Sequence, residues 1–163
     1  MPSERVTNIV VAGIGGQGVL RATDIVAEAA FLAGYDVKKT EVHGMSQRGG
    51  SVVSDVRFGS RILSPMVPEG EADFLVVLEP TQEEPNRHRL KPDGTVIGCD
   101  RIDVTSLPNP RTLNVALLGL LSRHLNIAVE AWHEAVGRCF PSHLYSVNVD
   151  AFELGRQAAD MAS

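Results

Sequence analysis

Residues Thr7–Gly18 read TNIVVAGIGGQG, and this stretch decides the fold class. Its first half is a β-branched, apolar run without polar interruption once it starts, which is typical of a central strand buried on both faces. Its second half is a glycine-rich turn. Small and apolar residues then recur at helical spacing from Val19 to Ala33, and Gly34 supplies a stop. The order of strand, glycine turn and helix predicts an α/β fold.

The turn matches the pattern G-x-G-x-x-G, and its candidate ligand-binding residues are Gly13, Gly15, Gly16, Gln17 and Gly18. Glycines let a ligand approach the backbone, and the N-terminus of the following helix offers free N–H groups to a phosphate. Dinucleotide binding also needs an acidic residue about 20 positions further on, and Glu41 lies near that place. A tight strand-to-helix turn needs glycines without any ligand, so both interpretations stay open.

Further strands are predicted along the first two thirds of the chain. A polar strand over 35–42 fits an edge position, and the apolar run over 72–78 fits a buried strand. Gly59-Ser60 stands between two extended runs and predicts a hairpin, which makes the sheet mixed. The full set of expected elements is: strands over 35–42, 51–58, 61–63, 72–78 and 95–97, a short helix over 81–90, and a turn over 91–94.

The last third is helical. Apolar residues at helical spacing predict helices over 113–125 and 128–140, the second with a core stripe of Val129, Trp132, Val136 and Phe140. Asp150 and Glu153 fit a capping box that begins a final helix. We therefore expect one α/β domain over residues 1–163. Its Rossmann-like mixed sheet, mostly parallel with a hairpin, would be flanked by helices and followed by a helical C-terminal part.

Composition excludes several classes of function. The net charge of −5 and the 5% of aromatic residues argue against a nucleic-acid partner. No secretory signal pattern opens the chain, and no apolar run approaches the roughly 20 residues of a membrane span, so we expect a cytoplasmic protein without membrane contact. Cys99 and Cys139 form no CxxC pair, and the histidines at 124, 133 and 143 have no common ligand spacing. We expect reduced thiols and no metal site.

A second motif follows the predicted edge strand. Residues 41–51 read EVHGMSQRGGS and contribute the candidate site residues Glu41, His43, Gly44, Met45, Gln47, Arg48, Gly49 and Gly50. The glycines allow a sharp turn, and Arg48 offers a planar fork of donors for a carboxylate or phosphate. The dinucleotide pattern does not explain this loop.

Together, GIGGQGV and EVHGMSQRGGSV resemble the paired motifs of the gamma subunit or domain of 2-oxoacid:ferredoxin oxidoreductases, most closely the small subunit of the indolepyruvate type. The resemblance covers nearly the whole chain. It extends more weakly to Asn114 with Leu118-Gly119, and to Asn148 with Ala151-Phe152 and Gly155. The chain is shorter than that small subunit, and we expect the shortening to fall within 99–111.

The resemblance implies an enzyme component with no catalytic residue of its own and no turnover alone. The complete enzyme oxidatively decarboxylates a 2-oxoacid with coenzyme A, giving an acyl-CoA, carbon dioxide and reduced ferredoxin. Thiamine diphosphate, magnesium and [4Fe-4S] clusters would belong to a larger partner subunit, and ferredoxin would be reduced by the complex. The 41–51 loop would then have one of three roles. It would pack on that subunit with Arg48 against a carboxylate, or it would line the thiamine channel or touch the phosphates of coenzyme A. In the third, it would form internal scaffolding with Arg48 paired to Glu41 or to carbonyls of the glycine turn.

Two other hypotheses remain at this stage. The glycine motif and Glu41 also fit a free-standing nucleotide-binding module. A regulatory or assembly protein that kept the fold without catalytic partners is the third.

Overall fold

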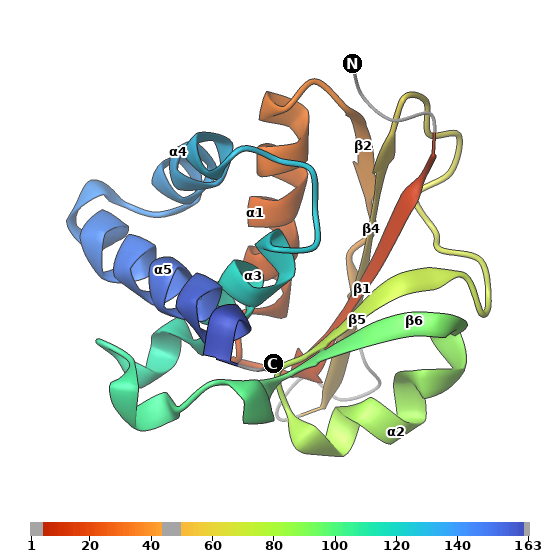
Figure 1. Ribbon diagram of the computed structural model, residues 1–163. Helices are drawn as coiled ribbons and strands as arrows, with labels where there is room; N and C mark the ends of the chain where they lie inside the picture. Colours follow the sequence, from red (N-terminus) through yellow and green to blue (C-terminus); the bar gives the residue numbers. More distant parts are fainter. Residues whose placement is uncertain (1–4, 44–49, 162–163) are drawn as a thin grey trace.

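One mixed β-sheet forms the centre of the structure (Figure 1), a computed structural model that describes residues 5–43 and 50–161. The strands in these ranges are β1 (Thr7–Ile14), β2 (Asp36–Lys39), β3 (Val42–His43), β4 (Ser51–Gly59), β5 (Ala72–Val77) and β6 (Leu90–Gly98). The α-helices are α1 (Val19–Leu32), α2 (Glu83–Asn86), α3 (Leu113–Ser122), α4 (Val129–Cys139) and α5 (Tyr145–Met161). The strand order is β2-β4-β1-β5-β6, and β3 also pairs with β4.

β1 lies in the middle of the sheet because both of its faces are apolar. Its residues Ile9, Val10, Val11 and Ala12 are fully buried. It pairs parallel with β5 and antiparallel with β4. The predictions of a central strand at this place, of a buried strand over 72–78 and of a polar edge strand after α1 are confirmed.

The predicted mixed α/β sheet is confirmed, but its hairpin and its balance of directions differ from the expectation. Only β1–β5 and β5–β6 are parallel among the described strands, while β4 pairs antiparallel with β1, β2 and β3. Residues 61–63 form no strand. β4 already has neighbouring strands on both sides. A strand that followed the Gly59-Ser60 turn would therefore find no free edge of β4 to pair with. The antiparallel neighbours consecutive in the chain are instead β3 and β4.

Two smaller boundaries were also predicted wrongly. The expected turn over 91–94 is a bulge inside β6, since Ala72 pairs with Leu90 and Phe74 with Thr95. The last helix begins at Tyr145, after a 3₁₀ turn, and not at Asp150. Glu153 therefore lies inside the helix and does not cap it, and its carboxylate lies 2.7 Å from Nε2 of His133 on α4.

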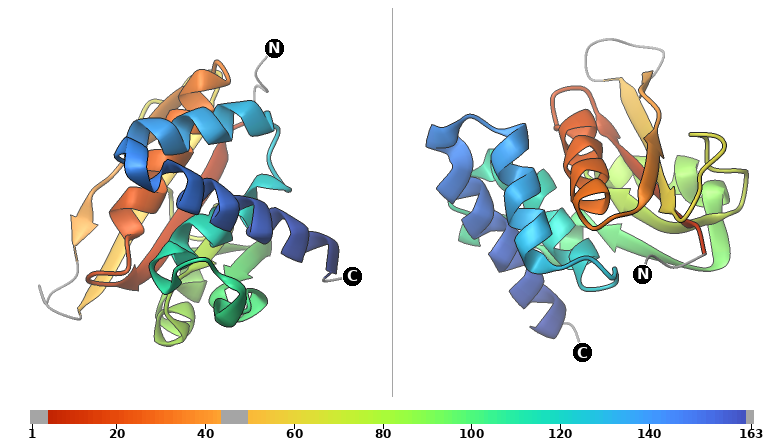
Figure 2. Two further views of the ribbon diagram at one scale, coloured as in Figure 1. Left: turned by 90° about the vertical axis from the view of Figure 1, so that its left-hand side faces the viewer. Right: turned by 90° about the horizontal axis from the view of Figure 1, so that it is seen from above.

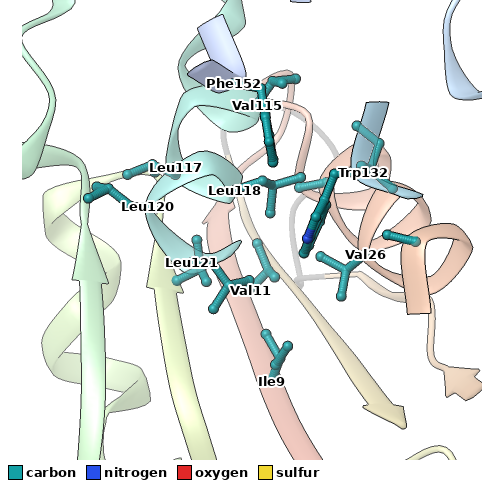
Figure 3. Close-up of a cluster of buried hydrophobic side chains, with 14 of the residues drawn as sticks. Ile9, Val11, Val26, Val115, Leu117, Leu118, Leu120, Leu121, Trp132 and Phe152 are labelled. Atoms are coloured by element: carbon teal, nitrogen blue, oxygen red, sulfur yellow. The ribbon is translucent and has the colours of Figure 1, made fainter. Parts of the chain in front are cut away.

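The helices α1, α3, α4 and α5 cover one face of the sheet (Figures 1 and 2). Figure 3 shows how their apolar side chains meet those of β1 in the main core. Val11, Leu118 and Trp132 are fully or almost fully buried there. The predicted core stripe of α4 is confirmed: Trp132 and Val136 are buried, while Val129 and Phe140 pack partly buried against the core. None of the helices in the described ranges is long and apolar enough to cross a bilayer.

The helices α3 and α5 approach each other backbone to backbone. A Cβ atom added at Gly155 would lie 1.8 Å from the carbonyl oxygen of Ala116, and one at Gly119 would lie 2.0 Å from that of Phe152. Only glycine leaves room for this contact. The contact holds α5 against α3 and so fixes the N-terminal end of α3, which borders the site described next.

Candidate functional site

The glycine turn lies where β1 ends and α1 begins. Gly16 has a φ of 90° and Gly18 a φ of 81°, in the left-handed region that glycine adopts without strain. Gly18 is also the N-cap of α1, and as a glycine it supplies this helix with no side-chain cap. The first backbone N–H groups of α1 have no partner within their own helix.

Gln17 fastens the turn through both ends of its side-chain amide. Its Oε1 accepts a hydrogen bond from the backbone N–H of Ile14 at 2.8 Å. Its Nε2 donates to Oε2 of Glu79, also at 2.8 Å. Glu79 follows the end of β5, whose last backbone contact with β1 is the bond from Leu78 N to Ala12 O. One side chain thus joins the carboxyl ends of two neighbouring parallel strands.

Asn114 brings the N-terminus of α3 against the same turn. Its Nδ2 donates to the carbonyl oxygen of Gly18 at 3.2 Å, and only 6% of the residue is exposed. A Cβ atom at Gly18 would lie 2.4 Å from this Nδ2, so the close approach requires glycine as much as the positive φ does. The N-termini of α1 and α3 therefore meet at one place.

A cavity of about 480 Å³ opens at this meeting point. We call its lining the glycine corner: Gly16, Gln17, Gly18, Leu78, Pro110, Arg111, Leu113 and Asn114. Neither α1 nor α3 has a side-chain N-cap bond or an acidic residue in its first turn. The positive ends of two helix dipoles and the exposed Arg111 bring positive charge to the corner, beside the Glu79 carboxylate that Gln17 binds. Such a surface suits a carboxylate or a phosphate.

The described end of the second motif adjoins the first. The N–H of Gly15 donates to the carbonyl oxygen of Gly50 at 3.0 Å, so the end of the 41–51 loop adjoins the glycine turn. His43 lies in β3, and its backbone pairs with Val52. Five of the predicted loop residues lie outside the described ranges: Gly44, Met45, Gln47, Arg48 and Gly49. The three interpretations of Arg48 therefore remain predictions.

Glu41 does not occupy the place that a dinucleotide site requires. In a dinucleotide-binding fold the acidic residue follows a strand that neighbours the first strand directly. Here β4 separates β2 from β1. The Glu41 carboxylate accepts a hydrogen bond from Lys39 Nζ at 3.1 Å, and Lys39 also pairs with Asp24 at 2.9 Å. Burial opposes the charge of Lys39, yet these two carboxylates raise its pKa above the ordinary value.

The residues of this chain do not fit the cofactors that its resemblance implies. A [4Fe-4S] cluster needs four thiolates, whereas the whole sequence has two cysteines. Both are free, and burial raises the pKa of each thiol, which disfavours the thiolate. Within 5–43 and 50–161, no three His, Cys, Asp or Glu side chains gather as metal ligands. His124 instead packs against the Phe74 ring, at 5.4 Å between centroids.

Glu79 was not identified as a site residue from the sequence. Arg111 was named only as the end of a shortened segment, and Asn114 only as a weak match to the family. Glu79 carried a usable signal, since it directly follows the most apolar strand of the chain. Carboxyl ends of parallel strands gather at one edge of a sheet, which is where ligand sites form. Asn114 lies 96 positions from its partner Gly18, and no local pattern indicates that contact.

Comparison with known proteins gives the family. The family model described as pyruvate ferredoxin/flavodoxin oxidoreductase matches residues 8–108, which include the glycine turn and the 41–51 loop. The chain belongs to this family. The expected likeness to subunits of 2-oxoacid:ferredoxin oxidoreductases is thereby confirmed, and the chain is an oxidoreductase component.

The chain is similar to the indolepyruvate oxidoreductase subunit IorB of Pyrococcus horikoshii, with 34% identity over 192 aligned positions that cover 93% of this chain and 95% of the relative. Because this chain has 163 residues, the alignment carries gaps on its side, in keeping with a shortened subunit. The keto/oxoacid ferredoxin oxidoreductase gamma subunit from Geobacter sulfurreducens PCA has a TM-score of 0.77 and 26% identity, with 96% of this chain and 99% of that chain covered.

A larger structure shares the fold. The 2-oxoglutarate:ferredoxin oxidoreductase from Magnetococcus marinus, solved with 2-oxoglutarate, coenzyme A and succinyl-CoA bound, gives a TM-score of 0.82 at 21% identity. The similarity covers 99% of this chain but 32% of that one, so this chain spans about a third of that neighbour's length.

Proposed function

We propose that this chain is the small subunit of an indolepyruvate-type 2-oxoacid:ferredoxin oxidoreductase, and that the glycine corner seats it against a larger subunit. In the complete enzyme, a 2-oxoacid and coenzyme A give an acyl-CoA and carbon dioxide while two electrons pass to ferredoxin. Thiamine diphosphate, magnesium and the iron-sulfur clusters belong to the larger subunit in this proposal. This chain binds and positions, and it carries no electrons.

The observation that carries the proposal is the similarity to IorB over almost the full length of both chains, in a sequence without cluster ligands. A [4Fe-4S] cluster needs four thiolates and the whole sequence has two cysteines, so in this proposal the clusters belong to another subunit. The similarity to an indolepyruvate subunit also supports the aryl-pyruvate substrate class.

The shape and charge of the glycine corner support its role as the docking site. The cavity is open, and it combines two helix N-termini with Arg111, whose side chain is exposed. A carboxylate of the larger subunit or a phosphate of coenzyme A would find the positive end of the α1 dipole and the Arg111 cation there. The 41–51 loop adjoins this surface through the Gly15–Gly50 bond and would extend it.

Reconstitution tests the function. The chain is purified alone and together with its larger subunit, and 2-oxoacid-dependent viologen reduction is measured with coenzyme A and indolepyruvate, phenylpyruvate, pyruvate or 2-oxoglutarate. We expect no turnover by the isolated chain, and turnover by the complex with aryl-pyruvates preferred. Full activity of the isolated chain would overturn the proposal, and a preference for 2-oxoglutarate would overturn the substrate class.

A pair of arginine variants tests the corner. Arg111→Ala removes the exposed cation of the cavity, and Arg61→Ala removes an exposed cation from the loop after β4. We expect Arg111→Ala to weaken association with the larger subunit about tenfold, the size of one charge-assisted contact, and Arg61→Ala to leave it unchanged.

Calorimetry of the isolated chain against NAD, FAD, ATP and coenzyme A tests the rival hypothesis, because a tight dinucleotide complex would favour a free-standing nucleotide module.

A further inference from the structure

Gln17 makes two contacts that the docking proposal does not require. Its Oε1 accepts a hydrogen bond from the Ile14 N–H, and its Nε2 donates one to the Glu79 carboxylate, both at 2.8 Å. These partners fix the orientation of the amide, since a backbone N–H needs an acceptor and a carboxylate needs a donor. Glutamine carries an acceptor oxygen and a donor nitrogen on one side chain, so it can make both bonds at once.

The two bonds have different tasks. The bond to Ile14 closes the glycine turn on the end of β1, over a separation of three residues. The bond to Glu79 crosses 62 residues of sequence and ties the turn to the end of β5. Gln17 and Leu78 both line the cavity, so the bond to Glu79 holds two of its walls at a fixed distance.

We propose that Gln17 is a positioning residue, which acts through Glu79 to hold the glycine corner in the shape that the larger subunit recognises. This inference rests on the proposed function. It assigns the glutamine of the GIGGQG motif a task distinct from that of the glycines: the glycines give the turn its conformation, and Gln17 sets its place relative to β5. Contact between Gln17 and a ligand is not part of this task.

The polarity of the pair provides a sharp test. Gln17→Glu keeps the acceptor for Ile14 but sets a carboxylate against the carboxylate of Glu79, at a position where the native atoms are 2.8 Å apart. The double variant Gln17→Glu with Glu79→Gln reverses the second bond, because the new amide at 79 donates to the new carboxylate at 17. Both native hydrogen bonds are thereby restored with the net charge of the pair unchanged.

The experiment measures the dissociation constant for the larger subunit and the activity of the complex, at pH values from 5 to 8. At pH 8 we expect Gln17→Glu to bind about tenfold more weakly or worse, and the double variant to bind within about threefold of the wild type. Two facing carboxylates share a proton as pH falls, so the deficit of Gln17→Glu should shrink toward pH 5. Gln157→Glu, the same charge change on an exposed position of α5, is the matched control and should bind like the wild type.

Three results would overturn the inference: native affinity of Gln17→Glu at pH 8, failure of the double variant to recover, or a deficit that does not depend on pH. Hydrogen exchange of the Ile14 amide in the full chain gives a reading without the partner. We expect faster exchange in Gln17→Ala and near-native exchange in Gln17→Glu, and equal exchange in all three chains would refute the geometry. If the wild-type chain itself fails to bind the larger subunit, the proposed function fails, while the exchange result still stands alone.

Discussion

Two regions of the molecule depend on glycine for opposite reasons. Between α3 and α5, Gly119 and Gly155 remove side chains so that two helix backbones touch. In the glycine turn, Gly16 and Gly18 adopt positive φ, and a Cβ at Gly16 would meet nothing within 4 Å. The first region is buried, whereas the second borders an open cavity.

The difference separates what holds the fold from what is left for a partner. A glycine between two packed helices already contacts the backbone of the facing helix, so replacing it should lower the free energy of unfolding. Gly16 faces open space and has no neighbour inside the chain, so its replacement should strain the turn locally and weaken binding in the complex. The G-x-G-x-x-G pattern alone does not distinguish these cases.

The largest effect is expected at the closed contact. Gly155→Ala places a methyl group 1.8 Å from the Ala116 carbonyl oxygen, which forces α5 away from α3. We expect the free energy of unfolding to fall by about 3 kcal/mol or more, as for severe overpacking of a core. Chemical denaturation of the isolated chain measures it. Gly137→Ala on α4 is the control, because that Cβ meets only the Tyr145 ring at 3.3 Å. Equal stability of the two variants would refute the close contact.

A smaller effect on stability and a larger one on docking are expected at the turn. Gly18→Ala combines a φ of 81° with a Cβ position 2.4 Å from Asn114 Nδ2, for a loss of about 2–3 kcal/mol. Gly16→Ala has a similar φ but no clash, so we expect about 1–2 kcal/mol. Both should weaken binding to the larger subunit, measured by calorimetry at a temperature where each variant is folded. If the loss of affinity for the larger subunit simply followed the loss of unfolding free energy in every variant, the glycine turn would have no separate role in docking.

Asp73 offers a third case, remote from both regions, at the start of β5. Burial alone would raise the pKa of this carboxyl, but hydrogen bonds from Lys91, the Asn8 N–H and Arg5 outweigh it and hold the pKa below its usual range. The resulting stability is complete above the unfolded pKa near ~4 and is lost as pH falls through the folded value.

The expected effect of Asp73→Asn is the smallest of the series. It should lower the free energy of unfolding at pH 7 by about 1–2 kcal/mol and flatten its decline below pH ~4, as followed by denaturation at several pH values. Affinity for the larger subunit should not change, because Asp73 lies at the opposite end of β5 from Leu78. A loss of affinity at unchanged stability would move the docking surface away from the glycine corner.

Local pattern was enough to predict much of the fold. The apolar run over 7–12, the glycine turn and the spacing of α1, α3 and α4 each carry their signal within a dozen residues. The hairpin at Gly59-Ser60 was wrong because a turn signal does not tell whether its strand has a free edge. The predicted start of α5 was wrong because Asp150 and Glu153 lie inside a helix that already begins at Tyr145, directly after a 3₁₀ turn.

The candidate site was predicted by motif and completed only by the fold. The turn was found from the spacing of its glycines, but Glu79, the partner of Gln17, and Asn114, the partner of Gly18, come from 62 and 96 positions away. The assignment of Glu41 to a dinucleotide site depended on the order of strands, which the sequence does not state. Topology placed β4 between the two halves of that supposed site.

The central claim is that the glycine corner faces the larger subunit, and hydrogen exchange of the full chain with and without that subunit tests it most directly. We expect slower exchange on binding at the backbone amides of Gly15 to Gly18, Arg111 and Leu113. Amides of the contact between α3 and α5 should not change, because that contact is already closed. Unchanged exchange throughout the corner in an active complex would contradict the account.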